Sequence, residues 1–170
     1  MKKLFVIVIS LFAGTHLLSA QKGEAFPDLS GKTMDGKSVS LPEDTKGKFT
    51  LVAIAQSVQA QAALESWLTP VQESLVDNPF FPVRLFFVPL LGNGMKEKVE
   101  QKMRDGLDES YFPYILIPDS EPEGIAKTLN MKDKSLPYFF VISPEGEITY
   151  ITSGTYSEAK LEAITDALSE

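Results

Sequence analysis

The sequence predicts an α/β domain in which a central mixed β-sheet lies between helices and an N-terminal β-hairpin precedes the sheet. The strongest observation is a continuously apolar run, residues 49–55, which is typical of a strand covered on both faces. This run passes through a short polar turn into an amphipathic helical pattern over residues 60–76. Further strand-like runs alternate with helical patterns, and a hairpin and a last helix close the chain. That order favours a mixed sheet flanked by helices.

Residues 1–20 are predicted to be a signal peptide, and residues 21–170 are predicted to form the folded domain. Two lysines precede an apolar stretch, residues 4–18, which is too short to span a bilayer comfortably, and Ala20 is a small residue suited to cleavage. An uncleaved membrane anchor is the alternative interpretation. We expect an exported chain, periplasmic or extracellular, whose mature part has no membrane span.

Composition excludes several classes of function. The 170 residues include no cysteine, and the single histidine, His16, lies inside the predicted signal peptide. Without Lys2 and Lys3 the 16 basic residues fall to 14, against 23 acidic residues, which gives the mature chain a net charge of −9. So acidic a chain is not expected to bind nucleic acid or anionic lipid, because phosphate contacts need clustered lysine and arginine. With no disulfide available, the fold must be stabilised by packing.

The mature chain opens with GEAFPDL, residues 23–29, and continues into a predicted hairpin. Asp35 and Gly36 form an Asp-Gly pair between two short β-like runs, and the second run, KSVSL at residues 37–41, alternates polar and apolar side chains. This pattern is a strong hairpin signal.

The helix over residues 60–76 carries one buried face. Pro70 lies within it and is expected to kink the helix, because proline removes one backbone donor and collides with the preceding turn. Asn78 and Pro79 are expected to end it. The three-and-four spacing of the buried face comes from Ala60, Leu64, Trp67, Leu68, Val71 and Leu75.

The middle of the chain predicts two strands and two helices. Residues 83–88, VRLFFV, indicate a second buried strand, and residues 95–104 indicate a solvated surface helix with a narrow apolar stripe. A short strand is predicted over residues 111–117, with Pro113 near its start, and a helix over residues 122–131.

The last third predicts a hairpin and a helix. Residues 138–142 and 148–152 flank Pro-Glu-Gly-Glu, residues 144–147, which is a turn composition. Residues 155–158, TYSE, have the form of a capping box. The buried stripe of the closing helix is expected to be Leu161, Ile164, Ala167 and Leu168.

Two stretches resemble the thioredoxin-like superfamily, in its exported, TlpA-like or peroxiredoxin-like form. One is FPDL at residues 26–29, followed by the strand and the helix that contains Pro70. The other is SLPYFFVI at residues 135–142, followed by the Pro-Glu-Gly-Glu turn. The resemblance spans residues 26–169 and implies that Pro137 is in the cis form. A trans proline that simply starts a strand is the alternative.

The chain departs from this family where the family keeps its paired cysteines. With the strand end at Ala55 as the register, Gln59 and Ala62 occupy the two positions, and with Pro70 as the register they are Ala62 and Glu65. Neither register supplies a sulfur, and thiol-disulfide exchange or a peroxidatic site requires a thiolate. We therefore expect no thiol-disulfide oxidoreductase or peroxidase activity.

The sequence offers no catalytic residue, no cofactor site and no metal site. Ser57 lies near a helix start, but no histidine and no lysine in the turn could act as its base. An enzyme of unrecognised, non-thiol chemistry that uses Ser57 or Glu65 remains a third hypothesis.

The first functional hypothesis is a groove that holds an extended peptide or protein partner in the cell envelope. In the thioredoxin-like fold, the residue before a cis proline can pair with the backbone of an extended peptide. The plainer interpretation is that the polar residues solvate an exposed turn. The predicted groove residues are Gln56, Ser57, Gln59, Gln61, Leu136, Pro137 and Tyr138.

An assembly or chaperone factor for an envelope or membrane complex is the alternative hypothesis. A family of mitochondrial ATP synthase assembly factors also resembles a thioredoxin-like domain without the paired cysteines. The similarity to this chain is one of general layout.

Overall fold

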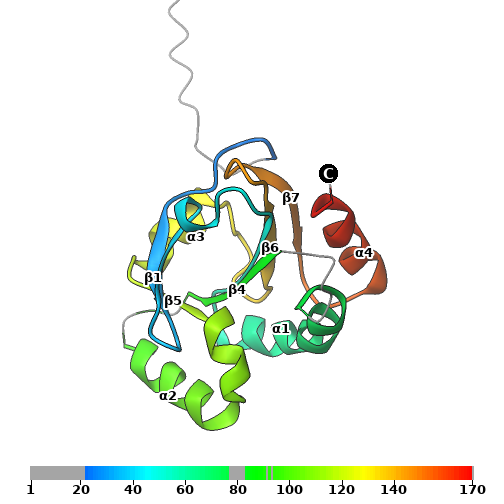
Figure 1. Cartoon of the computed structure of the whole chain (residues 1–170). Coiled ribbons are helices and arrows are strands. Elements are labelled where there is room, and N and C mark those ends of the chain that lie inside the picture. Colours follow the sequence, from blue (N-terminus) through cyan, green and yellow to red (C-terminus); the bar gives the residue numbers. More distant parts are fainter. Residues whose placement is uncertain (1–21, 77–82, 91, 93, 170) are drawn as a thin grey trace, which may run out of the picture.

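The computed structural model describes residues 22–76, 83–90, 92 and 94–169 (Figure 1). The predicted signal peptide and the helix end predicted at Asn78 and Pro79 lie outside the described residues. Within the described part of the chain, no helix has the length and apolar character needed to cross a membrane.

The strands and helices follow the predicted order. In chain order the strands are β1 (Leu29–Thr33), β2 (Ser38–Leu41), β3 (Thr50–Ala55), β4 (Arg84–Pro89), β5 (Leu116–Pro118), β6 (Tyr138–Ile142) and β7 (Ile148–Ser153). The helices are α1 (Val58–Val71), α2 (Lys96–Gly106), α3 (Pro122–Thr128) and α4 (Glu158–Ala167), with 3-10 helices at Glu43–Thr45 and Glu109–Tyr114 and a π-helical turn at Gln72–Val76.

The strands form two sheets, ordered β4-β3-β6-β7 and β2-β1-β5. β3 pairs with β4 in parallel, whereas β3 with β6 and β6 with β7 are antiparallel, so the four-stranded sheet is mixed, as predicted. β1 and β2 form the predicted hairpin at the N-terminal side. At its turn Gly36 has φ +92° and donates its N–H to the Thr33 carbonyl at 2.8 Å, a conformation that favours glycine.

The core lies on both faces of the four-stranded sheet, and β3 is buried along its whole length. Alternate side chains of a strand point to opposite faces. Leu51, Ala53 and Ala55 belong to the cluster that includes α1 and α4, whereas Val52 and Ile54 belong to the cluster that includes α3 and the hairpin. In Figure 1, α1 and α4 accordingly lie on one side of this sheet and α3 on the other.

Pro70 interrupts the regular helix where the sequence predicts a disturbance. α1 ends at Val71, and the chain continues as a π-helical turn over Gln72–Val76. Proline has no N–H, so the regular i to i−4 ladder loses a bond there. The Gln72 N–H is shared between the Leu68 and the Thr69 carbonyls at this end of α1.

The strand predicted over residues 111–117 is wrong for most of its length. Residues Glu109–Tyr114 form a 3-10 helix, and β5 begins only at Leu116. Asp108 caps this helix by accepting from the Ser110 N–H, and Pro113, which cannot donate to a strand ladder, sits inside it.

Two helix boundaries also differ from the prediction. α4 is capped by Ser157, whose hydroxyl accepts from the Lys160 N–H, and not by Thr155. α3 ends at Thr128 and not at residue 131, because Asn130 adopts φ 53° and the chain turns back there. The Met131 N–H donates to the Ala126 carbonyl at 2.9 Å, which closes a Schellman-type end.

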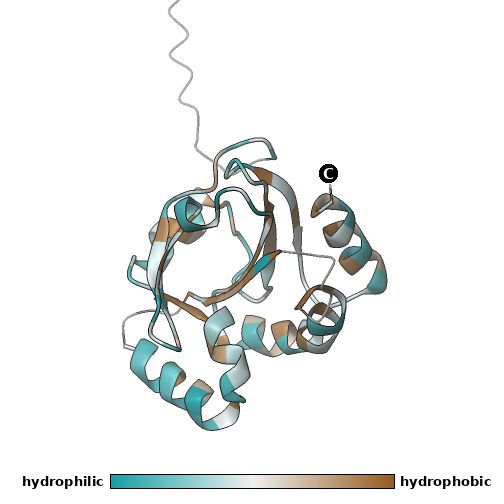
Figure 2. Ribbon diagram, in the orientation of Figure 1, coloured by the Kyte–Doolittle hydropathy of each residue, from teal (hydrophilic) through white to brown (hydrophobic). Residues whose placement is uncertain are grey.

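α2 is the solvated helix that the sequence predicts. Val99 is its one buried residue among those described, and Figure 2 shows a largely hydrophilic ribbon over α2 beside the hydrophobic strands of the central sheet.

Candidate functional site

The turn from β3 into α1 is held by Ser57. Its backbone is extended, and its Oγ accepts from the Ala60 N–H at 3.0 Å while the Ser57 carbonyl accepts from the Gln61 N–H at 3.0 Å. Serine is among the preferred helix N-cap residues because its side chain satisfies a donor that the first turn leaves free. The helix therefore begins at Val58.

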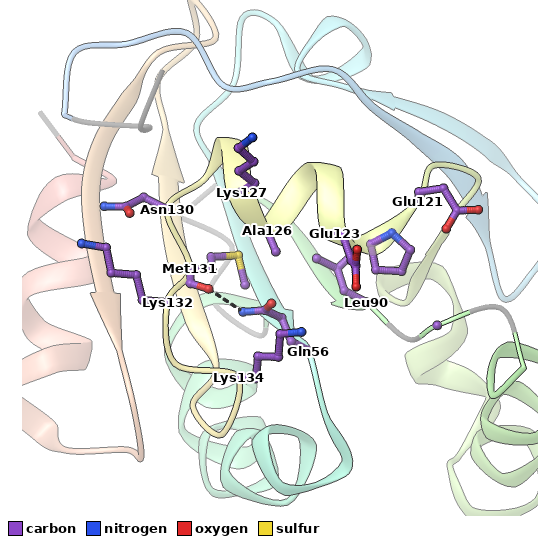
Figure 3. Close-up of a pocket in the computed structure, with 12 residues that line it drawn as sticks. Gln56, Leu90, Glu121, Glu123, Ala126, Lys127, Asn130, Met131, Lys132 and Lys134 are labelled. Atoms are coloured by element: carbon purple, nitrogen blue, oxygen red, sulfur yellow. Dashed lines mark hydrogen bonds between the residues drawn. The ribbon is translucent and has the colours of Figure 1, made fainter. Parts of the chain in front are cut away.

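Two side chains of this turn also bind the segment of residues 131–136, which we call the 131–136 loop. Gln56 Nε2 donates to the Met131 carbonyl at 3.2 Å (Figure 3), and Ser57 Oγ donates to the Lys134 carbonyl at 2.7 Å. Both acceptors are more than seventy residues away along the chain. The turn is thus tied to the segment that precedes Pro137.

The 131–136 loop has its own internal turn around Asp133. The Asp133 carboxylate accepts from the Ser135 hydroxyl at 2.6 Å and from the Ser135 N–H at 2.9 Å, and these bonds lower the pKa of Asp133 below its usual range. The carboxylate is the form that holds the turn. The stabilisation of the loop by this carboxylate is therefore fully present at pH values above the pKa of an ordinary aspartate. It is lost only as the pH falls through the lowered pKa of Asp133.

Pro137 is not in the cis form that the resemblance implied. Within the described residues the cis bond is Leu41–Pro42, so the Leu136–Pro137 bond is trans. The chain already reverses in the 131–136 loop through Asp133, and Pro137 directly precedes β6, with its carbonyl accepting from the Gly154 N–H at 2.9 Å. A trans bond, the lower-energy form, is sufficient for that geometry.

The predicted groove residues do not all lie on one surface. Gln59 is exposed on the first turn of α1, while Pro137 is buried. Leu136 and Tyr138 are half-buried, and the Tyr138 hydroxyl accepts from the Asp133 N–H at 2.9 Å. Gln61 lines a separate cavity on the α2 side.

That cavity, which we call the α1–α2 cavity, has a volume of about 430 Å³. Its walls come from α1, α2, β4 and the chain before β5, and they are mostly apolar. Among the lining side chains are Leu64, Leu68, Phe87, Val99, Met103 and Tyr111. Ligand pockets in proteins span about 300 to 1,000 Å³ and are lined mainly by apolar groups.

Gln61, which lines this cavity, carries the one buried side-chain nitrogen or oxygen that lacks a hydrogen-bond partner in the described part of the chain. The Nε2 atom is buried and has no hydrogen-bond partner among the described residues. Leaving a buried amide donor unpaired costs about 1 to 3 kcal/mol. Sequence analysis singled out Gln61 but missed the cavity, because the narrow apolar stripe of α2 gives no sign of how far that helix stands from α1.

A second hollow, of about 620 Å³, lies between Gln56, α3 and the 131–136 loop (Figure 3). Its charged lining is mixed, so it does not favour an ion of either sign. The charged residues that line it are Glu121, Glu123, Lys127, Lys132 and Lys134.

Comparison with known proteins assigns the family. The family model described as ATP10 protein matches residues 10–170. The chain belongs to the ATP10 protein family. No curated protein matches it.

Solved structures similar to this ATP10-family chain have thioredoxin-like folds. The thioredoxin domain of a thiol-disulfide oxidoreductase from Bacteroides vulgatus has a TM-score of 0.64 and 18% identity, covering 88% of this chain and 99% of that chain. The exposed lipoprotein thioredoxin Etrx1 from Streptococcus pneumoniae has a TM-score of 0.59 and 21% identity, covering 82% and 99%.

BsSco, a member of the Sco family of cytochrome c oxidase assembly proteins, has a TM-score of 0.62 and 16% identity, covering 89% and 95%. At these identities the likeness shows the fold, and the ATP10-family chain has the thioredoxin-like fold.

The start of α1 favours one of the two registers for the missing cysteines of this ATP10-family chain. A reactive thiol benefits from a helix N-terminus, which lowers its pKa. Gln59, the first position of one register, lies in the first turn of α1, whereas Ala62, the first position of the other, lies in the second turn. The register with Gln59 and Ala62 therefore fits the geometry, and neither residue carries sulfur.

We expect Ser57→Ala to lower the free energy of unfolding by about 2 kcal/mol, because it removes an N-cap and the bond to the Lys134 carbonyl. Ser157→Ala is the matched control, since Ser157 also caps a helix and its side chain bonds no distant loop in the described part of the chain. Urea denaturation of both variants measures the difference. Equal losses would contradict a contribution from the tie to the 131–136 loop.

Proposed function

We propose that this ATP10-family chain is an exported, non-redox thioredoxin-like module that binds a protein partner during the assembly of an envelope or membrane complex. One observation carries the proposal. At the amino end of α1, where the fold would place a reactive thiol, the chain has Gln56 and Ser57 bound to loop carbonyls and no nucleophile with a base beside it. The side chains of this turn therefore have a structural role, since they bind the turn to the 131–136 loop.

The assembly role is supported by two points. BsSco, which shares the fold, is a member of a family of cytochrome c oxidase assembly proteins. The layout of this chain also resembles assembly factors that lack the paired cysteines. Export is supported by the character of residues 4–18 and by the fold's presence in the exposed lipoprotein Etrx1.

The surface proposed for the partner is the amino end of α1 together with residues 136–138, at the end of the 131–136 loop and the start of β6. Gln59 is exposed there, and Leu136 and Tyr138 are partly accessible. The Gln59 side chain makes no hydrogen bond within the described residues, so its amide is available to a partner's backbone. A catalytic use of Ser57 has less support, because its hydroxyl already donates to the Lys134 carbonyl.

The first test is a redox assay. Without a thiolate, the purified chain is expected to reduce insulin disulfides in the presence of dithiothreitol no faster than buffer. A thioredoxin with paired cysteines serves as the positive control. A rate above buffer would overturn the non-redox part of the proposal.

The second test is crosslinking and affinity purification of the tagged chain from membranes of its source cells. Subunits of one membrane complex are expected to co-purify, in unfinished assemblies more than in the finished complex. Gln59→Arg should reduce the yield, whereas Gln101→Arg, the same change at an exposed position on α2, should not. Equal yields from both variants would show that the partner does not bind at this surface.

A further inference from the structure

The hollow of about 620 Å³ between Gln56, α3 and the 131–136 loop, which we call the α3 hollow, lies at the carboxyl ends of two parallel strands. Gln56 directly follows β3 and Leu90 directly follows β4, and both line the hollow. In sheets of parallel strands, ligands bind in the crevice outside the carboxyl ends of the strands. The volume also falls within the range of ligand pockets, so position and size both favour a binding site.

The charges of the α3 hollow are divided between two elements. Lys132 and Lys134 belong to the 131–136 loop, whereas Glu121 and Glu123 lie at the start of α3. Figure 3 shows Lys132 and Glu121 on opposite sides of the hollow. A single ion meets both signs here and gains little, whereas a molecule that carries both charges can match the two sides.

The opposite charges around the hollow do not neutralise one another. Glu123 and Lys127 lie one turn apart on α3, a spacing that allows a salt bridge, but they do not form one. The ion pairs among the described residues lie elsewhere, after β2 and on α2. Lys132 and Lys134 are exposed and form no ion pair within this part of the chain. Both signs are therefore available to an incoming molecule.

The base of the α3 hollow is apolar. Leu90 and Met131 line it and are buried, and Ala126 and Pro122 line it and are half-buried. The lysines and glutamates, in contrast, are exposed and lie at its rim. An occupant that fits both parts has an apolar group for the base and charged groups for the rim.

An extended peptide segment provides this arrangement. Successive side chains of an extended chain point to opposite faces. When the middle side chain of three points to the base of the hollow, its two neighbours therefore point to the rim. An apolar residue between an acidic and a basic residue meets all three features of the hollow.

The wall that carries the lysines continues into the proposed partner surface. Gln56 Nε2 donates to the Met131 carbonyl at 3.2 Å and Ser57 Oγ donates to the Lys134 carbonyl at 2.7 Å, so the loop is fixed beside the amino end of α1. Residues 136–138, at the end of this loop, are part of the partner surface. A partner segment bound there can extend over the loop into the hollow, and the fixed loop lowers the cost of ordering the site.

We propose that the α3 hollow binds an extended segment of the protein partner in which an apolar residue lies between an acidic and a basic residue. The acidic side chain pairs with Lys132 and Lys134, and the basic side chain pairs with Glu123. The apolar side chain contacts Leu90 and Met131. This inference rests on the proposed partner-binding function and names the chemistry of the segment that is bound.

The test is an NMR titration of the full chain with the blocked tripeptide N-acetyl-Glu-Leu-Lys-amide at low ionic strength, into the millimolar range. The expected result is a saturable shift of the backbone amide resonances of the residues that line the hollow. N-acetyl-Gln-Leu-Gln-amide, which keeps the shape without the charges, should produce no such shift. The tripeptides that carry only the Glu or only the Lys should each bind about two- to fivefold more weakly than the doubly charged one.

Two variants remove one charge each from the hollow. Lys134→Gln and Glu123→Gln are each expected to weaken binding of the doubly charged tripeptide about two- to fivefold. Lys98→Gln on α2 and Glu158→Gln, in the first turn of α4 as Glu123 is in that of α3, do not line the hollow and should leave the affinity unchanged. Lys134→Gln keeps the backbone carbonyl that accepts from Ser57, so the loop remains bound to the turn.

Several results would overturn the inference. These are the absence of shifts at the hollow, equal binding of the neutral tripeptide, equal binding of a tripeptide with one charge, or unchanged affinity in both variants. Shifts at the hollow that depend on protein concentration without a peptide would assign the site to a second copy of the chain, which also overturns it.

Failure of this inference is distinguishable from failure of the proposed function. In the affinity purification, the double variant Lys134→Gln with Glu123→Gln is expected to reduce the yield of membrane-complex subunits. The double variant Lys98→Gln with Glu158→Gln should not. If the subunits are retained with both double variants and the tripeptide does not bind, the hollow is rejected as their site. The partner-binding function then still stands if Gln59→Arg lowers the yield, and it fails if that variant has no effect either.

Discussion

Replacing Trp67 with alanine is expected to lower the free energy of unfolding by about 3 to 5 kcal/mol. Trp67 is fully buried on the inner face of α1 and is the only tryptophan in the chain. Its ring packs against Phe139 of β6 at a centroid distance of 4.2 Å and a tilt of 36°, and edge-on at 5.5 Å against Tyr156. Removing it leaves a cavity between the helix and the sheet that this side chain joins.

The indole of Trp67 also makes a specific bond, which a milder variant isolates. Nε1 donates to the Gly154 carbonyl at 3.0 Å. Trp67→Phe keeps most of the ring contact and loses this bond, so it should cost about 1 to 2 kcal/mol, clearly less than alanine. Urea denaturation followed by far-UV circular dichroism measures both, because the variants lack tryptophan fluorescence. Similar losses in the two variants would contradict the packing role of the ring.

Gly31→Ala is expected to destabilise the fold by about 3 kcal/mol, at the upper end of the usual cost of overpacking. Gly31 lies in β1 between β2 and β5 and is paired with Pro118. A Cβ at this position would lie 2.2 Å from the Ile117 carbonyl oxygen. The clash is with backbone, so β5 has to move away from β1 to relieve it.

Gly124→Ala is the matched control for Gly31→Ala. Gly124 lies in α3, and a Cβ there meets nothing within 4 Å. The same change should therefore raise stability by about 0.5 to 1 kcal/mol through helix propensity. Thermal unfolding of the two variants should move in opposite directions. If Gly31→Ala left the stability unchanged, β5 would be free to shift away from β1, which would contradict the observed register between these two strands.

The order of elements was predictable because each depends on a local pattern. The buried run of β3, the three-and-four spacing of α1 and the Asp-Gly turn of the hairpin are all signals within a few residues, and the structure confirms them. The strand predicted over residues 111–117 failed for a related reason. Its apolar composition suits a strand, but the cap at Asp108 and the presence of Pro113 gave the 3-10 helix the better local hydrogen bonds.

The candidate site was only partly predictable. Ser57 was recognised as lying close to a helix start, but its partner, the Lys134 carbonyl, is 77 residues away along the chain. Gln61 was named for a groove facing Pro137, and the structure places it instead in the α1–α2 cavity. Helical periodicity gives the direction of a side chain on its own helix, whereas the gap between two helices depends on how both pack on the sheet.

By itself the sequence determined the class of fold and one chemical limit. A chain without cysteine has no thiolate, whatever its folded form, and periodic burial fixes strands and helices locally. Only the tertiary structure decided that Pro137 is trans, that the turn at Ser57 is bound to the 131–136 loop, and that a cavity with an unpaired amide lies beside it. These features arise from contacts between segments that are far apart in the sequence. A local sequence pattern does not encode how close such segments come in space.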